Sequence, residues 1–237
     1  MDIDPDAVPD VLLLLSEAEA CLTSDVARSG VLARQALALV EATGRPLLLA
    51  RALCTAAAPL LFEKDLPGAQ QLYQRAVVQS QLMHDTSTLS RALNGLGLCA
   101  LRQGAYAQAL AFFLDGLRQT PPEDAFGRLR LLNNIGLTRM EVGDHAFALQ
   151  VHEQVVALAE ELGEEISVLT GLTNIIVDRY ELGEYTRVLT LIEQAQPDIM
   201  RSGLVAHRVV LAIYATLCSL QLGELAQAQA AATRLLP

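Results

Sequence analysis

The sequence contains no tryptophan, and only 4% of its 237 residues are aromatic. Its four cysteines, Cys21, Cys54, Cys99 and Cys218, lie far apart in apolar stretches and form no CxxC pair. Buried free thiols are favoured over disulfide bridges, which points to a reducing cytoplasm.

Basic residues are few and scattered. Seventeen Lys and Arg against 27 Asp and Glu leave a formal net charge of −10. Nucleic-acid binding needs a clustered basic surface, so nucleic acid is not expected as a partner. The longest apolar run, from Val209 to Leu220, is too short for a bilayer, which takes about 20 residues, and the acidic start MDIDPDAVPD is unlike a signal peptide. We expect a soluble cytoplasmic protein that does not bind membranes.

Apolar residues at helical spacing are abundant, and they recur with a fixed period. Four segments, RQGAYAQAL, EVGDHAFAL, ELGEYTRVL and QLGELAQAQ, place glycines at positions 104, 143, 183 and 223, which are 39, 40 and 40 residues apart. Apolar helical patterns lie before and after each glycine, so each unit is predicted to be two helices joined by a tight turn. Glycine suits such a turn because it enters the left-handed backbone conformation at low cost.

Two weaker units precede these four. Lys64 takes the place of the glycine in one of them, and the stretches Asp10–Cys21 and Asp25–Thr43 predict a degenerate first helix pair. No segment has the alternation of a strand. We therefore predict one all-α domain over residues 1–237, with a degenerate pair at 1–45 and repeats at 46–84, 85–123, 124–163, 164–203 and 204–237. That organisation makes about twelve helices in six antiparallel pairs.

Within these units the residues follow a family motif. Its first copy is Leu93, Leu96, Gly97, Ala109, Phe113 and Pro121; its second is Leu132, Ile135, Gly136, Ala148 and Val155, with His152 at the aromatic position; its third is Leu172, Ile175, Tyr185 and Ile192. The sequence thus resembles the tetratricopeptide repeat superfamily. Its period near 40 is similar to the long repeats of kinesin light chain, Leu-Gly-Asn-repeat scaffolds and bacterial repeat-containing regulators. The resemblance implies a right-handed α-α superhelix whose first helices line a concave groove.

Gly97 and Gly136 stand inside helices, where glycine costs about 1 kcal/mol relative to alanine. We interpret them as points where a first helix closely approaches its own second helix, opposite Ala109 and Ala148. Phosphate binding by the GLG segment is disfavoured because no strand precedes it.

Residues that could carry chemistry are few. His145 and His152 lie seven apart on one helix face beside Glu153, so a metal site is an alternative to core packing there. No third ligand stands at a suitable spacing, so core packing is favoured and no metal or other cofactor is expected. His84 and His207 have no neighbouring nucleophile. We therefore expect no enzymatic activity; a phosphatase built from similar repeats is an alternative for which no residue can be nominated.

The face of each first helix that points away from its second helix carries a recurring stripe. Three arginines share one depth, with asparagines beneath two of them and apolar residues below. Arginine and asparagine pair with carboxylates and backbone amides, while the apolar floor buries side chains of a ligand. The predicted partner-binding residues are Arg51, Arg91, Arg130, Asn94, Asn133, Leu98, Leu101, Leu137, Met140, Val177 and Tyr180. The alternative is that the apolar residues pack repeat on repeat and the arginines pair with neighbouring glutamates.

Two hypotheses for function follow. The first is a non-enzymatic scaffold that captures a protein or peptide segment in its concave groove. The second is the sensory or regulatory N-terminal region of a longer bacterial signalling protein, a transcription regulator or a cyclic-dinucleotide enzyme. The last helix, predicted over Glu224–Leu236, is short and has no polar cap, so we expect that either the chain continues or self-association covers the final repeat.

Overall fold

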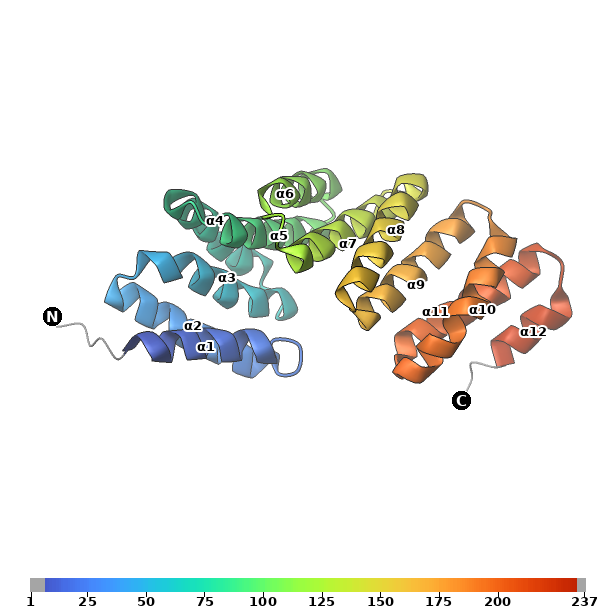
Figure 1. Cartoon of the computed structure of the whole chain (residues 1–237), viewed down its shortest axis with the longest axis horizontal. Coiled ribbons are helices and arrows are strands. Elements are labelled where there is room, and N and C mark those ends of the chain that lie inside the picture. The colour runs from blue at the N-terminus through green and yellow to red at the C-terminus, as the bar shows by residue number, and fades with distance from the viewer. Residues whose placement is uncertain (1–6, 234–237) are drawn as a thin grey trace. The chain divides into compact units, whose positions relative to one another are not determined.

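The computed structural model describes residues 7–233, which form twelve α-helices and no strand (Figure 1). This confirms the all-α prediction and the number of helices. The helices are α1 (Ala7–Cys21), α2 (Val26–Thr43), α3 (Pro46–Phe62), α4 (Leu66–Met83), α5 (Thr86–Arg102), α6 (Tyr106–Gln119), α7 (Ala125–Glu141), α8 (His145–Leu162), α9 (Glu165–Glu181), α10 (Tyr185–Ser202), α11 (Val205–Gln221) and α12 (Leu225–Thr233). The last three residues predicted for the final helix lie outside the described residues.

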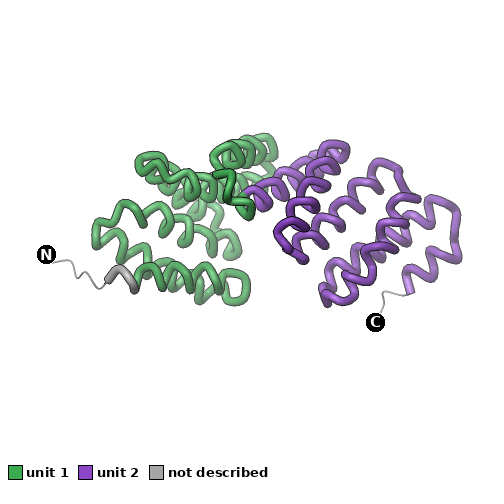
Figure 2. The backbone as a smooth tube through the Cα atoms, in the orientation of Figure 1, with its two compact units in different colours: residues 1–127 green, residues 128–237 purple. Residues whose placement is uncertain are grey.

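The chain divides into two compact units, Met1–Gly127 and Arg128–Pro237 (Figure 2). Helices α1 to α6 belong to unit 1, and α8 to α12 belong to unit 2. The boundary falls within the first turn of α7, so the prediction of one domain over residues 1–237 stays a prediction.

The turns inside the helix pairs share one backbone geometry. Gly104, Gly143, Gly183 and Gly223 have φ angles of 73, 78, 78 and 79°. The N–H of the residue after each glycine bonds the carbonyl five positions earlier, as in Ala105 to Ala100 at 2.9 Å, which satisfies a carbonyl at the helix end. Lys64 takes the same conformation, with a φ of 64°. Lys64 therefore marks a fifth turn of the same kind, as its position predicts.

In each unit the odd-numbered helices form a layer that we call the inner layer. Helix α3 contacts both α1 and α5 in unit 1, and α9 contacts α11 in unit 2. The even-numbered helices pack against the odd-numbered ones and form the outer layer. The unit 1 core includes Leu53, Tyr73 and Leu96, and the unit 2 core includes Ile176 and Leu211. The apolar stripes of both layers thus meet between them.

The glycines inside helices make room for rings. A Cβ added at Gly97 would lie 2.3 Å from the Phe113 ring of α6, and one at Gly136 would lie 2.4 Å from Nε2 of His152 on α8. These glycines lie where a first helix meets its second, as predicted. The nearest side chains are those of Phe113 and His152. That these glycines lie opposite Ala109 and Ala148 stays a prediction. The ring needs the volume that a methyl group on the glycine would fill.

The four cysteines are free, as predicted. Cys21 is half-buried, and the other three are buried. Burial raises the pKa of Cys54 to about 12 and the pKa values of Cys99 and Cys218 to about 11. These three thiols therefore stay protonated at neutral pH, where a thiol is a poor nucleophile and metal ligand.

Candidate partner-binding face of the inner helices

All eleven predicted partner-binding residues lie on odd-numbered helices, and each unit carries its own part of the stripe. Asn94 is buried, Arg130 is exposed and the others are half-buried. In unit 1 they are Arg51 on α3 and Arg91, Asn94, Leu98 and Leu101 on α5; in unit 2 they are Arg130, Asn133, Leu137 and Met140 on α7 and Val177 and Tyr180 on α9. Their role in binding stays a prediction.

The arginines of unit 1 converge on one carboxylate that sequence reasoning did not single out. Glu19, on α1, accepts hydrogen bonds from Arg51 Nη2 at 2.7 Å and Nε at 3.3 Å, and from Arg91 Nη1 at 2.7 Å. The Thr55 hydroxyl donates to the same carboxylate at 2.8 Å, and Arg91 Nη2 donates to that hydroxyl at 3.2 Å. The alternative interpretation, in which the arginines pair with a glutamate, therefore holds for Arg51 and Arg91.

This cluster has a strong effect on the acidity of Glu19. Burial by itself would raise the pKa of the Glu19 carboxyl, but the hydrogen bonds from Arg51, the charge of Arg91 and the Thr55 hydroxyl outweigh burial and lower that pKa to about 2. Glu19 is therefore ionised at neutral pH. Two guanidinium groups face one carboxylate, so these three side chains keep one positive charge in excess.

The apolar residues of the stripe pack against neighbouring helices and also leave part of their surface exposed. Leu98 packs against the unit 1 core and is still half-buried rather than buried. In unit 2, the Tyr180 ring lies 5.4 Å from Tyr185 on α10 and 5.1 Å from Tyr214 on α11, measured between ring centroids. Such tilted and edge-on pairs are favourable aromatic contacts. Tyr180 is thus fixed by neighbouring helices, while it leaves part of its surface open.

His145 and His152 both bond Asp178, a residue of α9 that the sequence pattern did not point to. Nδ1 of His152 lies 2.7 Å from Oδ2 of Asp178, and Nδ1 of His145 lies 3.0 Å from Oδ1. The side chains of Asp178 and His152 are fully buried. Among the described residues, no cluster of three or more His, Cys, Asp or Glu side chains has the geometry to hold a metal ion. The favoured interpretation of core packing fits this arrangement, in which the carboxylate ties α8 to α9.

Arg139 and Arg179 lie forty residues apart, and each forms an ion pair with an acidic residue on the other side of the turn that follows it. Arg139 Nη1 lies 3.3 Å from Oδ2 of Asp144, and Arg179 Nη1 lies 2.6 Å from Oε2 of Glu184. The guanidinium of Arg139 also covers the Phe147 ring at 4.6 Å from its centroid. Each arginine thus joins the end of a first helix to the start of the second.

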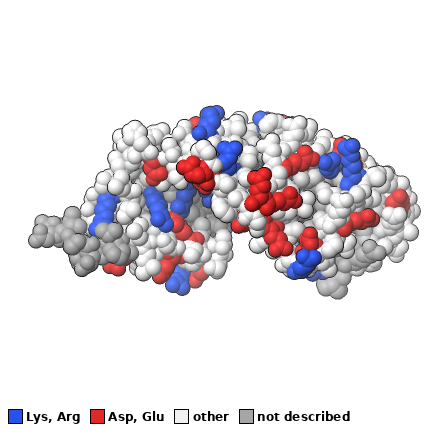
Figure 3. Space-filling model, in the orientation of Figure 1, with Lys and Arg blue, Asp and Glu red and all other residues white. Residues whose placement is uncertain are grey.

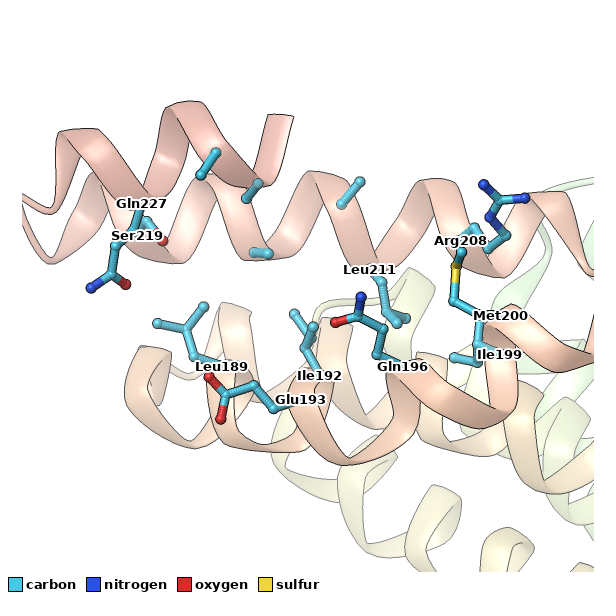
Figure 4. Close-up of a pocket in the computed structure, with 14 residues that line it drawn as sticks. Leu189, Ile192, Glu193, Gln196, Ile199, Met200, Arg208, Leu211, Ser219 and Gln227 are labelled. Atoms are coloured by element: carbon cyan, nitrogen blue, oxygen red, sulfur yellow. The ribbon is translucent and has the colours of Figure 1, made fainter. Parts of the chain in front are cut away.

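Unit 2 contains a pocket that the sequence did not predict. It has a volume of about 490 Å³ and lies between α10, α11 and α12. Figure 4 shows Leu189, Ile192 and Gln196 of α10 pointing toward α11 and α12. Its walls mix apolar side chains with the polar groups of Glu193, Gln196 and Gln227. No local sequence signal could have found it, because its lining comes from three helices over some forty residues.

Charges of both signs are interleaved on the face drawn in Figure 3, where Lys and Arg atoms adjoin Asp and Glu atoms instead of forming one basic area. The ion pairs Arg75–Glu41 and Arg118–Asp115 are examples on the outer layer, at 2.6 and 3.2 Å. Within residues 7–233, none of the helices combines the length and the hydropathy that crossing a membrane requires.

Residues 131–166 match the family model of the Tetratricopeptide repeat. This segment spans most of α7, all of α8 and the beginning of α9. Among curated proteins, the chain is similar to the human Intraflagellar transport protein 88 homolog, with 24% identity over 98 residues. That match covers 40% of this chain and only 12% of the human protein.

Solved structures share the fold along most of the chain. The putative kinesin light chain repeats of Podosopora anserina superpose with a TM-score of 0.62 at 15% identity, over 86% of this chain and all of theirs. A Rap protein complexed with Competence and Sporulation Factor superposes with a TM-score of 0.74 at 12% identity, over 97% of this chain and 74% of that one. At such identities the likeness shows the fold, a solenoid of tetratricopeptide-like helix pairs.

Proposed function

We propose that this chain, a helical-repeat protein of the tetratricopeptide type, is a non-enzymatic scaffold that captures an acidic protein or peptide segment on its inner layer. Scaffolds of this fold serve protein–protein interaction, and they bind their partners through the surface that the stacked helices present.

One observation carries it: the inner layer of unit 1 already holds a carboxylate. Arg51 and Arg91 come from different helices and reach the same Glu19 side chain at 2.7 Å each. Charge-assisted bonds of this length are among the stronger contacts that a protein makes with an acid. Leu98 and Leu101 follow on α5 within about three further turns, so the same surface offers both charge and an apolar floor to an extended segment.

A structural relative supports the choice of class. The Rap protein that shares this fold was solved in complex with Competence and Sporulation Factor. Capture of a separate factor is therefore compatible with helix pairs of this kind. Under the proposal, the partner of this chain is a protein segment with acidic side chains, and neither a cofactor nor nucleic acid takes part.

The test starts from a displayed library of random peptides selected on the full chain. The peptides that enrich are then titrated against variants of the stripe. Leu101→Ala in unit 1 and Arg130→Ala in unit 2 are expected to weaken the affinity of a peptide that uses that unit by about tenfold, which corresponds to about 1.4 kcal/mol. Arg75→Ala on the outer layer is the matched control and should leave affinity unchanged. A library that yields no binder, or binders indifferent to both stripe variants, would remove the proposal.

Helix α11 exposes apolar residues that the corresponding helix of the preceding repeat buries, and this favours a second copy of the chain as a further partner. Val209 is 45% exposed, whereas Leu169, at the same place in the preceding repeat, is 2% exposed. The same holds for Ile213 at 48% and Thr173 at 7%. We infer that another helix covers this face, and that it comes from a second copy of the chain. The hypothesis that this chain is the sensory region of a longer signalling protein puts an output domain there instead, and remains the second candidate.

A further inference from the structure

The cluster around Glu19 has the composition of a binding site whose ligand belongs to the same chain. The carboxylate comes from α1, while the groups that hold it, Arg51, Thr55 and Arg91, come from α3 and α5. Four donor contacts reach one carboxylate, at 2.7, 2.7, 2.8 and 3.3 Å. An Asp or Glu side chain or a C-terminal carboxylate from another molecule would present the same oxygen atoms to the same donors.

Two of the three donor side chains, Thr55 and Arg91, also contact each other. The Thr55 hydroxyl lies 2.9 Å from the backbone carbonyl of Arg51, to which it can donate its one proton when Glu19 is absent, and Arg91 Nη2 donates to that hydroxyl. Helix α1 has its own apolar anchors, since Val11 and Leu15 are fully buried and pack with Ala36 and Val40 of α2. Removal of the Glu19 carboxylate would therefore leave α1 packed on α2 and the contact between Thr55 and Arg91 intact.

The charged groups of the site are partly open to solvent, whereas Thr55 beneath them is only 2% exposed. The side chains of Glu19, Arg51 and Arg91 are 27, 34 and 33% exposed. A carboxylate in solution can therefore approach the two guanidinium groups, which a fully buried ion pair would not allow. The excess positive charge of the cluster also favours the approach of a second anion.

We propose that Arg51, Thr55 and Arg91 form a carboxylate-binding site of unit 1, and that Glu19 is an internal occupant which a carboxylate of a partner replaces. Glu19 then acts as a built-in competitor. A partner carboxylate binds only to the fraction of molecules in which Glu19 has left the site, so the internal occupant lowers the apparent affinity. This inference rests on the proposed function only in naming the external ligand as an acidic protein segment.

The first experiment uses acetate as the probe and needs no partner. Glu19→Ala in the full chain removes the internal occupant, and thermal unfolding is measured in sodium acetate and in sodium chloride at equal ionic strength and pH 7. We expect acetate to raise the Tm of E19A over the chloride value in a saturable manner. The wild-type protein should need about tenfold more acetate for the same effect, since Glu19 fills its site about nine-tenths of the time. Glu19→Ala with Arg91→Ala should lose the acetate effect.

The matched control is Glu41→Ala. Glu41 pairs with Arg75 at 2.6 Å on the outer layer, so this variant leaves one exposed guanidinium without its carboxylate. One guanidinium in water should not select acetate over chloride. If E19A does not fold in chloride, Glu19→Ser carries the same comparison, because serine also removes the carboxylate and is too short to fill the site. Equal Tm values in acetate and chloride for the variant that folds would overturn the proposal.

The second experiment links the site to the partner. Acidic peptides that bind the wild-type chain should bind E19A about tenfold more tightly, the factor expected if Glu19 fills the site about nine-tenths of the time. Unchanged or weaker binding would contradict the replacement of Glu19. If no peptide binds at all while acetate still stabilises E19A, the carboxylate site stands and the proposed capture of peptides fails.

Discussion

Lys64 holds a left-handed backbone conformation at a turn where four other repeats use glycine. This conformation costs a side-chain-bearing residue roughly 1–2 kcal/mol, and Lys64 is exposed, so removal of its side chain loses little packing. Glycine relieves this cost in the folded state, but it also gives the unfolded chain more conformational entropy, which offsets part of the gain. Lys64→Gly should therefore raise the free energy of unfolding by about 0.5–1 kcal/mol. Urea unfolding measures this. Gly104→Ala is the inverse control, since no atom lies within 4 Å of its added Cβ, and a gain in stability there would contradict the argument.

Gly97 tests the opposite effect, in which space rather than backbone conformation requires glycine. Alanine is favoured over glycine in a helix by about 1 kcal/mol, so propensity alone predicts that Gly97→Ala is stabilising. The fully buried ring of Phe113 occupies the position of the new methyl group, and overpacking costs about 1–3 kcal/mol. We expect a net loss of about 1–2 kcal/mol in urea unfolding. Phe113→Leu in the same background should recover part of it; a stabilised single variant would show that the ring moves freely.

The residues that sequence reasoning placed well are those whose role is local. The turn glycines, and Lys64 among them, act through their own backbone and so recur at a fixed spacing. Asp178 was missed because its partners, His145 and His152, lie 33 and 26 residues away and its function depends on how side chains meet. Glu19 was missed for the same reason, since its α1 position is not part of the stripe.

Between elements, the Glu19 cluster ties α1 to α3 and α5, and this link depends on pH. The folded-state pKa of Glu19 lies at about 2, below the ordinary value of 4.5, so its stabilising effect is complete above pH 4.5 and is lost as the pH falls toward 2. Glu19→Gln should be less stable than wild type by about 2 kcal/mol at pH 6, after allowance for partial exposure. The difference should shrink below pH 4.5 in urea unfolding; a difference that does not change with pH would contradict this origin.

His152 and Asp178 form a second link between elements, and they should be energetically coupled. Phe113 and Thr138 stand at the corresponding places in other repeats, so His152→Phe and Asp178→Thr are natural replacements. His152→Phe alone removes a hydrogen-bond partner from a fully buried carboxylate, which should cost about 2–4 kcal/mol. The double variant should lose at least about 1 kcal/mol less than the sum of the single losses. Additive losses in urea unfolding would show that the 2.7 Å contact carries no coupling.

For the whole molecule, the sequence predicted the succession of twelve helices over the described residues because each repeat packs mainly on its neighbours. A period near forty residues is enough to place helices and turns. The pocket between α10, α11 and α12 and the pairing of Arg91 with Glu19, 72 residues apart, depend on side-chain lengths in three helices at once. Periodicity holds no such information, which is why the stripe was predicted and its internal ligand was not.

Self-association is the prediction that belongs to the whole molecule. Val209, Ile213 and Leu220 lie on α11 and are 45, 48 and 49% exposed, and α11 contains no acidic residue that would oppose a second copy. Two copies related by a two-fold axis would each bury this face on the other, as successive repeats bury the equivalent face within the chain. Sedimentation equilibrium should therefore give twice the 25.5 kDa mass of the chain.

Ile213→Glu should convert this dimer to a monomer, because two carboxylates would then be buried at the contact. Val78→Glu, at an apolar residue of α4 in the outer layer that is 58% exposed, should leave the dimer intact. A wild-type chain that sediments as a monomer at all concentrations would exclude a second copy as the occupant of α11. The exposed face would then belong to a different domain or protein, which is what the signalling hypothesis requires.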